Sequence, residues 1–342
     1  MEGFLAPGFE GVGEAFAADA RGGSALTVLR HGVPVVDVRE GWRDAARTMP
    51  WDANTLVNVY SVGKPIMAAA VRLLEKRGLI AIQAPAATYW PSFRTNASVR
   101  DLLSHLAALP SFPLARPVEA WADWDLLCAD LAAAEPEWEP GTVAAEHALT
   151  YGHLLGELVR RVDGRPPARF VAEELPFDFA FALSDADLAR CAELEFDAPD
   201  WPARMLGEPG SVHARAVSNP PGARDLAVVN GPRWRRAAIP AVNVHATAHG
   251  IAEFYAALLD GRLPALAIPQ YTGPDLFLET EVTWGLGVQI EADGTWGQGG
   301  LGGNAGWADP ARGLAIAYVT RRLGDFAAVD RIEAALKELP ES

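Results

Sequence analysis

Alternation of apolar and polar residues, the pattern of strands, is concentrated near the two ends of this 342-residue sequence, and this limits its folds more than any other feature. Residues 24–42 alternate around a turn, RHG, and predict a β-hairpin. Residues 282–323 hold several short alternating segments separated by glycines, which predict successive antiparallel strands. Between them, helical periodicity and proline-rich loops predominate, and the clearest helices are expected in residues 101–110, 123–136 and 148–164. We therefore predict an α+β fold in which the two distant ends build one sheet.

The first and last helices of the chain are expected to flank this sheet. Four segments around it have helical periodicity: residues 9–20, 65–80, 247–261 and 325–339. We predict an α/β lobe from residues 1–82 and 235–342, with an antiparallel sheet and N- and C-terminal helices. Residues 83–234 would form an inserted all-α lobe. Because ligand sites favour such boundaries, the active site is expected at the seam between the lobes.

Composition excludes several kinds of partner. The formal net charge is −15, from 44 acidic and 29 basic residues, so we expect neither nucleic acid nor a membrane surface as a partner. No apolar run reaches the roughly 18 residues of a membrane span, and the acidic N-terminus is unlike a signal peptide, so a cytoplasmic protein is expected. The two cysteines, Cys128 and Cys191, are expected to be buried and reduced. The histidines show no metal-ligand spacing, so no metal or other cofactor is expected.

A serine lies three residues before a lysine where a long apolar helix begins, at Ser61 and Lys64 in SVGKPIMAAAV. At this spacing both side chains lie on one helical face. A serine hydroxyl becomes a strong nucleophile only when a base takes its proton, and a lysine can do so when desolvation lowers its pKa. Backbone N–H groups at the helix start can also hold an oxyanion. By itself the pattern is weak, because a capping serine and a solvated lysine would look the same.

The surroundings of this pair resemble the serine β-lactamase and penicillin-binding-protein superfamily, and most of all its class C β-lactamase and family VIII carboxylesterase branch. Five stretches carry the resemblance, in order along the chain: LVNVYSVGKPIMAAAVRLLEKRGLI (56–80), SVRDLLSHLAALP (98–110), WEPGTVAAEHALTYGHLLGELVRRVDGR (138–165), VVNGPRWRRAAIPAVNVHATAHGIAEFYAALL (228–259) and GQGGLGGNAGWADPARGLAIAYVTRRL (297–323). Together they extend over most of the chain.

The resemblance implies a β-lactamase-like fold and a covalent acyl-serine intermediate. Ser61 matches the family's nucleophile and Lys64 matches its partner base. The oxyanion hole would consist of the backbone N–H groups of Ser61 and Leu301. These roles are expectations from the resemblance.

The second motif departs from the family, where it usually begins with a tyrosine. Here the matching stretch is EHALTYG, so Glu146 stands in place of that tyrosine, followed by His147. Tyr151, five residues further on, is an alternative, and His147 could act beside Glu146. We prefer Glu146 because the flanking PGT and HALTYG set the register. A carboxylate there would hold Lys64 as an ammonium, which makes Glu146, or a water it orients, a candidate base.

The third motif departs as well, since Gln298, Gly299 and Gly300 replace the usual Lys-Thr-Gly. We expect these residues to line the substrate site, where glycines allow a close approach of backbone and substrate. The neutral Gln298 lacks the cation with which lactamases bind a substrate carboxylate. We therefore expect β-lactamase activity to be weak or absent.

Three functions remain in competition. The leading hypothesis is hydrolysis of a small ester through an acyl-Ser61 intermediate. The second is a specialised transacylase that passes the acyl group to an amine or alcohol, which a water-excluding pocket would favour. The third is a catalytically inactive homologue that still binds a ligand. In each case the partner is a small molecule, an acyl substrate for the first two.

Overall fold

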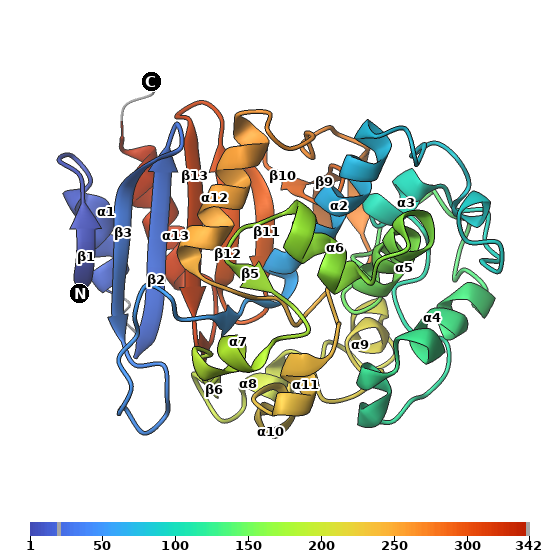
Figure 1. Ribbon diagram of the computed structural model, residues 1–342, viewed down its shortest axis with the longest axis horizontal. Coiled ribbons are helices and arrows are strands. Elements are labelled where there is room, and N and C mark those ends of the chain that lie inside the picture. Colours follow the sequence, from blue (N-terminus) through green and yellow to red (C-terminus); the bar gives the residue numbers. More distant parts are fainter. Residues whose placement is uncertain (19–21, 340–342) are drawn as a thin grey trace.

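The two ends of the chain form one sheet. The computed structural model describes residues 1–18 and 22–339, and its main sheet is antiparallel with the order β1-β3-β2-β13-β12-β11-β10-β9-β8 (Figure 1). β2 pairs with β13 from Ser24 opposite Thr320 to Arg30 opposite Leu314, which confirms the predicted α+β class. Its strands are β1 (Glu2–Leu5), β2 (Gly23–Arg30), β3 (Val33–Gly41), β8 (Tyr271–Asp275), β9 (Thr280–Trp284), β10 (Gln289–Ile290), β11 (Trp296–Gly300), β12 (Asn304–Asp309) and β13 (Leu314–Thr320).

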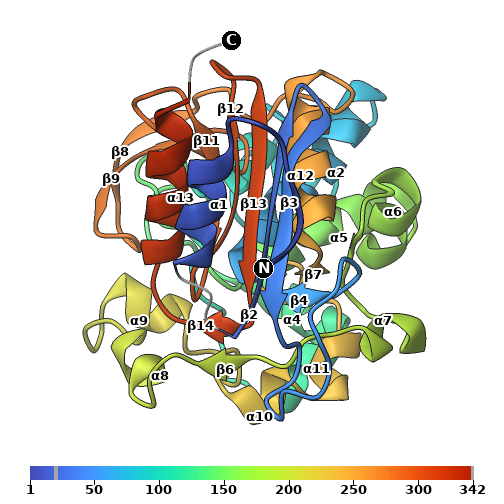
Figure 2. The same cartoon turned by 90° about the vertical axis from the view of Figure 1, so that its left-hand side faces the viewer.

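Helices cover both faces of this sheet (Figure 2). On one face lie α1 (Glu10–Ala17) and α13 (Ala327–Lys337), and on the other lies α12 (Ala248–Leu259). β2 is buried on both sides: Val28 packs toward α1 and α13, whereas Leu29 joins the larger core on the α12 face. This double burial explains why β2 carries apolar side chains on both of its faces.

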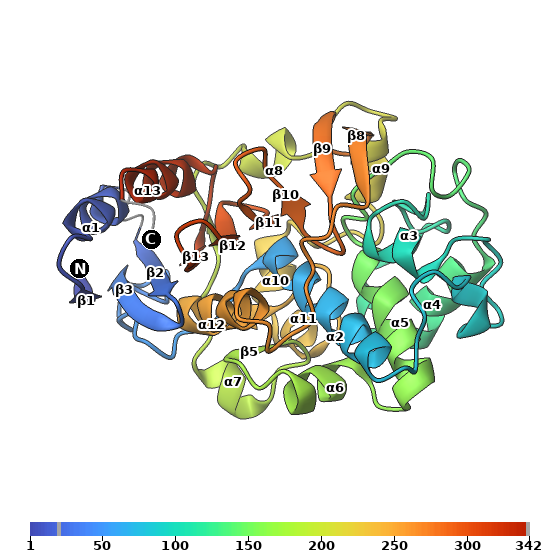
Figure 3. The same cartoon turned by 90° about the horizontal axis from the view of Figure 1, so that it is seen from above.

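The four helices predicted in residues 9–20, 65–80, 247–261 and 325–339 correspond to α1, α2 (Lys64–Lys76), α12 and α13. The last two residues of the predicted 9–20 segment lie outside the described residues. α2 contacts β11 on one side and α5 and α6 on the other (Figure 3). The remaining helices are α3 (Val99–Leu103), α4 (Trp124–Ala133), α5 (Tyr151–Asp163), α6 (Pro167–Glu174), α7 (Asp185–Ala189), α8 (Trp201–Arg204), α9 (Val212–Ala216), α10 (Leu226–Val229) and α11 (Pro232–Arg236), with 3-10 turns η1 (Tyr60–Gly63), η2 (Ala86–Thr88) and η3 (Val118–Ala122). The boundaries of the two proposed lobes, at residues 82 and 235, remain a prediction.

Two further small sheets connect distant segments. A three-stranded antiparallel sheet has the order β4-β7-β5, from β4 (Val57–Asn58), β7 (His245–Ala246) and β5 (Phe179–Ala180). The parallel pair of β14 (Arg322–Leu323) and β6 (Glu195–Phe196) attaches the middle of the chain to the end of β13. β4 leads directly into η1, so the first of these sheets positions the start of α2.

The structure corrects two details of the sequence analysis. The helix expected in residues 101–110 ends at Leu103, and both His105 and Ala108 adopt positive φ angles. The His105 ring is fully buried against Tyr151 and Trp284, so tertiary packing determines this bend. The edge strands β1 and β8 were not expected. β8 contains a proline, which a sheet tolerates at its edge.

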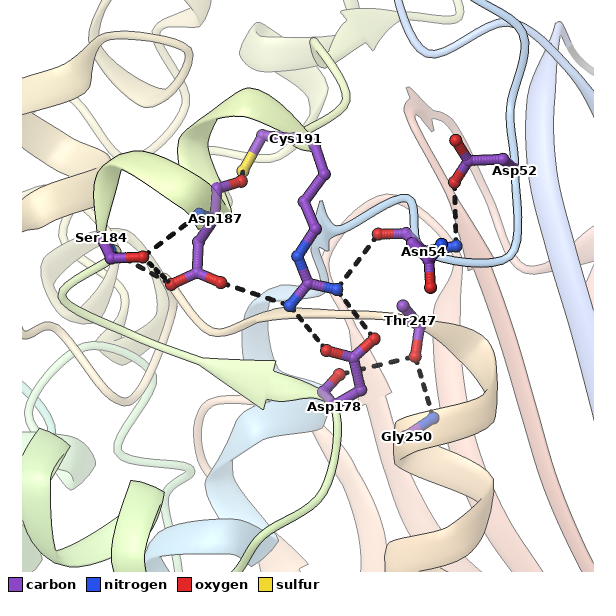
Figure 4. A network of polar contacts seen from close by, with 9 residues as sticks. Asp52, Asn54, Asp178, Ser184, Asp187, Cys191, Thr247 and Gly250 are labelled. Carbon is purple, nitrogen blue, oxygen red and sulfur yellow. Dashed lines mark hydrogen bonds and ion pairs between the residues drawn. The ribbon is translucent and has the colours of Figure 1, made fainter.

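A polar network joins the loop before β4 to the segment around α7 (Figure 4). The Arg190 guanidinium donates to both carboxylate oxygens of Asp178, at 2.6 and 2.9 Å, and to the Asn54 carbonyl at 3.2 Å. The thiol of Cys191 donates to the Asp187 carbonyl at 3.3 Å. Cys191 and Cys128 are both buried and unpaired, as predicted.

Candidate active site

Ser61 lies in η1, the single 3-10 turn that leads into α2. The turn packs against β11, and the close approach depends on a glycine. A Cβ atom on Gly300 would lie 2.2 Å from the Val59 carbonyl oxygen. Tyr60, directly before the serine, has a φ angle of 50°, a conformation that non-glycine residues rarely adopt and that is often found at functional sites. The serine is therefore held in a tightly specified turn.

Ser61, Lys64 and Glu146 form a continuous hydrogen-bonded chain. Lys64 Nζ donates to Ser61 Oγ at 2.5 Å and to Glu146 Oε1 at 2.7 Å. The lysine side chain is entirely buried and the glutamate side chain is 7% exposed. A buried ion pair of this kind loses much stability when one partner is removed. The structure thus brings together the three residues that the sequence analysis placed at the centre of the site.

Glu146 is held through its backbone by a residue that the sequence analysis did not identify. The Glu146 N–H donates to Asp275 Oδ1 at 3.1 Å, and Trp284 Nε1 donates to Asp275 Oδ2 at 2.8 Å. The same carboxylate accepts the N–H groups of Phe277 and Leu278. Asp275 therefore connects the second-motif segment to the loop after β8. No motif marks it in the sequence.

Tyr151 lies in the core, away from the serine. Its hydroxyl donates to the Leu103 carbonyl at 3.0 Å and its ring packs on His105, with centroids 4.5 Å apart. Burial raises the pKa of Tyr151. The residue does not line the cavity beside Ser61, whereas Glu146 does. The geometry therefore favours Glu146 over Tyr151 in the second-motif position.

His147 is also buried outside the cavity. Its Nδ1 lies 2.9 Å from the Ala145 carbonyl, and its Nε2 accepts the Leu109 N–H at 3.3 Å. Burial lowers the pKa of His147 to about 3. The ring is therefore neutral near pH 7 and connects its own segment to the backbone at Leu109. It does not contact Ser61, so its contribution to the site is indirect.

The third motif forms one wall of the cavity. Gln298, Gly299 and Gly300 all line it, as does Leu301. Gln298 Nε2 lies 3.4 Å from Glu146 Oε1, at the outer limit of a hydrogen bond. Both predicted oxyanion donors, the N–H groups of Ser61 and Leu301, belong to residues of this same cavity.

The cavity has a volume of about 310 Å³ and mostly apolar walls. Its residues come from all three predicted segments of the chain: Tyr60 and Ser61 from 1–82; Glu146, Ala148, Leu149, Met205, His213, Val217, Ala223 and Arg224 from 83–234; Val242, Phe277, Leu278, Gln289, Gln298, Gly299, Gly300, Leu301 and Phe326 from 235–342. None of the eleven tryptophans lines it. Its size suits a small, largely apolar ligand.

No group of three or more histidine, cysteine, aspartate or glutamate side chains is arranged to hold a metal ion in the described part of the chain. Similarly, none of the helices within residues 1–18 and 22–339 has the length and apolarity needed to cross a membrane.

Comparison with known proteins agrees with this arrangement. The Beta-lactamase family model matches residues 12–339. The chain belongs to the β-lactamase family. Among family members, it is 34% identical to Esterase/beta-lactamase LipL of Mycobacterium tuberculosis (strain ATCC 25618 / H37Rv), over 88% of this chain and 77% of that protein. The β-lactamase-like fold expected from the sequence is therefore confirmed.

Two solved structures of the β-lactamase fold match almost completely. A family VIII carboxylesterase superposes with a TM-score of 0.88 at 30% identity, covering 99% of both chains. A penicillin-binding-protein homologue from Caulobacter crescentus gives the same TM-score, identity and coverage. The chain is thus a β-lactamase-fold member of a family that includes esterases and other hydrolases.

Proposed function

We propose that this protein is a serine esterase that hydrolyses small carboxylic esters through an acyl-Ser61 intermediate. The observation that carries the proposal is the chain of hydrogen bonds from Ser61 through Lys64 to Glu146, at 2.5 and 2.7 Å, beside an apolar cavity. The similarity to proteins described as an esterase and a carboxylesterase supports it.

In the proposed mechanism, Glu146 takes a proton from Lys64, and the neutral amine then takes the proton of Ser61 Oγ as that oxygen attacks the ester carbonyl. The N–H groups of Ser61 and Leu301 would hold the oxyanion. When the tetrahedral intermediate collapses, Lys64 returns a proton to the leaving alkoxide. Water then attacks the acyl-serine by the same route and regenerates the hydroxyl.

Turnover of 4-nitrophenyl acetate and butyrate tests the proposal. We expect release of nitrophenol by the wild type and its loss in Ser61→Ala, together with a covalent adduct on Ser61 after treatment with a fluorophosphonate probe. Intact-mass spectra without an adduct, or unchanged turnover by Ser61→Ala, would refute it. Adding an amine or alcohol would measure whether the acyl group also passes to these acceptors. Tight ligand binding without turnover would favour the inactive homologue. The cytoplasmic location stays a prediction.

A further inference from the structure

Arg224 brings a positive charge to the wall of the cavity, in the stretch that precedes α10. Its Nη1 donates to the Met205 carbonyl at 2.7 Å. Among the described residues, no carboxylate pairs with this guanidinium, and its other N–H groups have no hydrogen-bond partner. Burial lowers the pKa of Arg224, because the cation is partly removed from water without a counter-charge.

The other charged groups near this cavity are already matched. Glu146 is the one acidic residue that lines it, and Lys64 neutralises that carboxylate at 2.7 Å. Most of the remaining wall is aliphatic or aromatic. An anionic ligand would therefore meet one unmatched cation, and that cation carries several free donors in the planar arrangement that suits a carboxylate.

The position of Arg224 relative to the nucleophile is set by Tyr60, the residue before Ser61. The Tyr60 hydroxyl donates to the Ala223 carbonyl at 3.1 Å. Arg224 therefore begins about one tyrosine side chain away from the backbone that carries the nucleophile. Ser61 and Arg224 line the same cavity of about 310 Å³, and this volume limits the acyl group to a short chain.

A purely structural role does not account for the residue. The hydrogen bond from Arg224 to the Met205 carbonyl uses only one of the five guanidinium N–H groups. The same carbonyl also lies 3.3 Å from His213 Nε2. The remaining N–H groups of Arg224 are not among the buried side-chain atoms that lack a partner, so they are accessible and can bind an anion that enters the cavity. The structure thus offers a reason for a ligand at this place.

We propose that Arg224 binds a terminal carboxylate on the acyl group of the substrate, so that the enzyme prefers half-esters of short dicarboxylic acids. This rests on the proposed function, because it specifies the acyl group that Ser61 would carry. The apolar walls would contact the methylene chain, and the guanidinium would bind its far end. The sequence analysis had inferred that the site lacks a carboxylate-binding cation, and Arg224 would supply one from a different segment.

Matched substrates test the preference. Mono(4-nitrophenyl) glutarate carries the carboxylate, and methyl 4-nitrophenyl glutarate is its neutral counterpart of nearly equal length. We expect kcat/KM to favour the anionic ester in the wild type. Arg224→Met should lower kcat/KM for the anionic ester by about 10- to 100-fold, the usual value of a charged hydrogen bond, and change the neutral ester little. Arg224→Lys should restore part of the loss.

A charge-matched control is Arg233→Met, which removes an exposed arginine that does not line this cavity and should change neither substrate. Binding is measured separately by calorimetry with monomethyl glutarate and Ser61→Ala protein, with and without Arg224→Met. This readout is independent of turnover, so an inactive enzyme would refute the esterase proposal alone. Equal loss for both esters in Arg224→Met, or equal binding with and without Arg224, would overturn the role of Arg224.

Discussion

Replacing Glu146 by glutamine separates two roles that this carboxylate could have. The substitution keeps the shape and removes the negative charge that lies 2.7 Å from Lys64 Nζ. Lys64 has no exposed surface, so its ammonium would lose its only carboxylate partner among the described residues. Removing one partner of a buried pair costs about 3 to 5 kcal/mol. We therefore expect Glu146→Gln to be folded and substantially less stable than the wild type.

The effect on activity follows from the proton path. If Glu146 takes the proton that leaves Lys64, the glutamine variant should lose about 100-fold in kcat, the usual size of a general-base contribution. If Glu146 only holds Lys64 as an ammonium, removing it would free the amine and activity should be maintained or rise. Urea unfolding measures the first effect, and 4-nitrophenyl butyrate kinetics, at a temperature where the variant is folded, measure the second.

Glu157→Gln is the matched control. Glu157 is fully buried, accepts hydrogen bonds from Arg160, Arg161 and Trp124, and does not line the cavity. Its substitution should lower stability and leave kcat of the folded protein within about threefold of the wild type. Wild-type kcat in Glu146→Gln would show that the proposed route of the proton is wrong.

Three further predictions concern the surroundings of the site. Gly300→Ala should abolish turnover and lower the unfolding midpoint, because the added Cβ would lie 2.2 Å from a backbone oxygen. The control Gly299→Ala, whose added Cβ would meet only a phenylalanine ring at 3.1 Å, should fold normally. Equal unfolding midpoints for the two variants would contradict this. Tyr151→Phe should lower the free energy of unfolding, measured with urea, by about 1 kcal/mol and leave kcat within twofold of the wild type. A hundredfold loss of kcat would show that Tyr151 takes part in catalysis. Burial lowers the pKa values of three histidines to about 3: His147, His153 and His245. Below about pH 6.5 the unfolded chain binds protons on these histidines and the folded chain does not. Acid should therefore destabilise the fold between about pH 6.5 and pH 3, by about 2 kcal/mol for each of these histidines at pH 5. Stability that is constant over this range in urea titrations would show that these rings are not held neutral.

Local patterns in the sequence account for much of the architecture. Alternation predicted the β2-β3 hairpin and the C-terminal strands, and helical periodicity predicted α2, α12 and α13. The three-residue spacing of Ser61 and Lys64 predicted their contact, since neighbouring turns of a helix bring such side chains together. Glu146 was matched to the second motif through the family resemblance that its flanking residues carry. In each case the determining interaction lies within a few residues or within one recognisable motif.

Other features depend on contacts between segments that are far apart in the sequence. Asp275 positions Glu146 from 129 residues away. The Tyr60 hydroxyl donates to the carbonyl of Ala223, the neighbour of Arg224, across 163 residues. His105 ends α3 early because its ring is buried against Trp284. Such contacts leave no periodicity or spacing in the sequence, because their geometry exists only after the sheet and helices have packed. The sequence alone thus determined the inner strands of the sheet, the main helices and the serine-lysine pair, whereas tertiary packing decided its edge strands and which distant side chains hold and line the site.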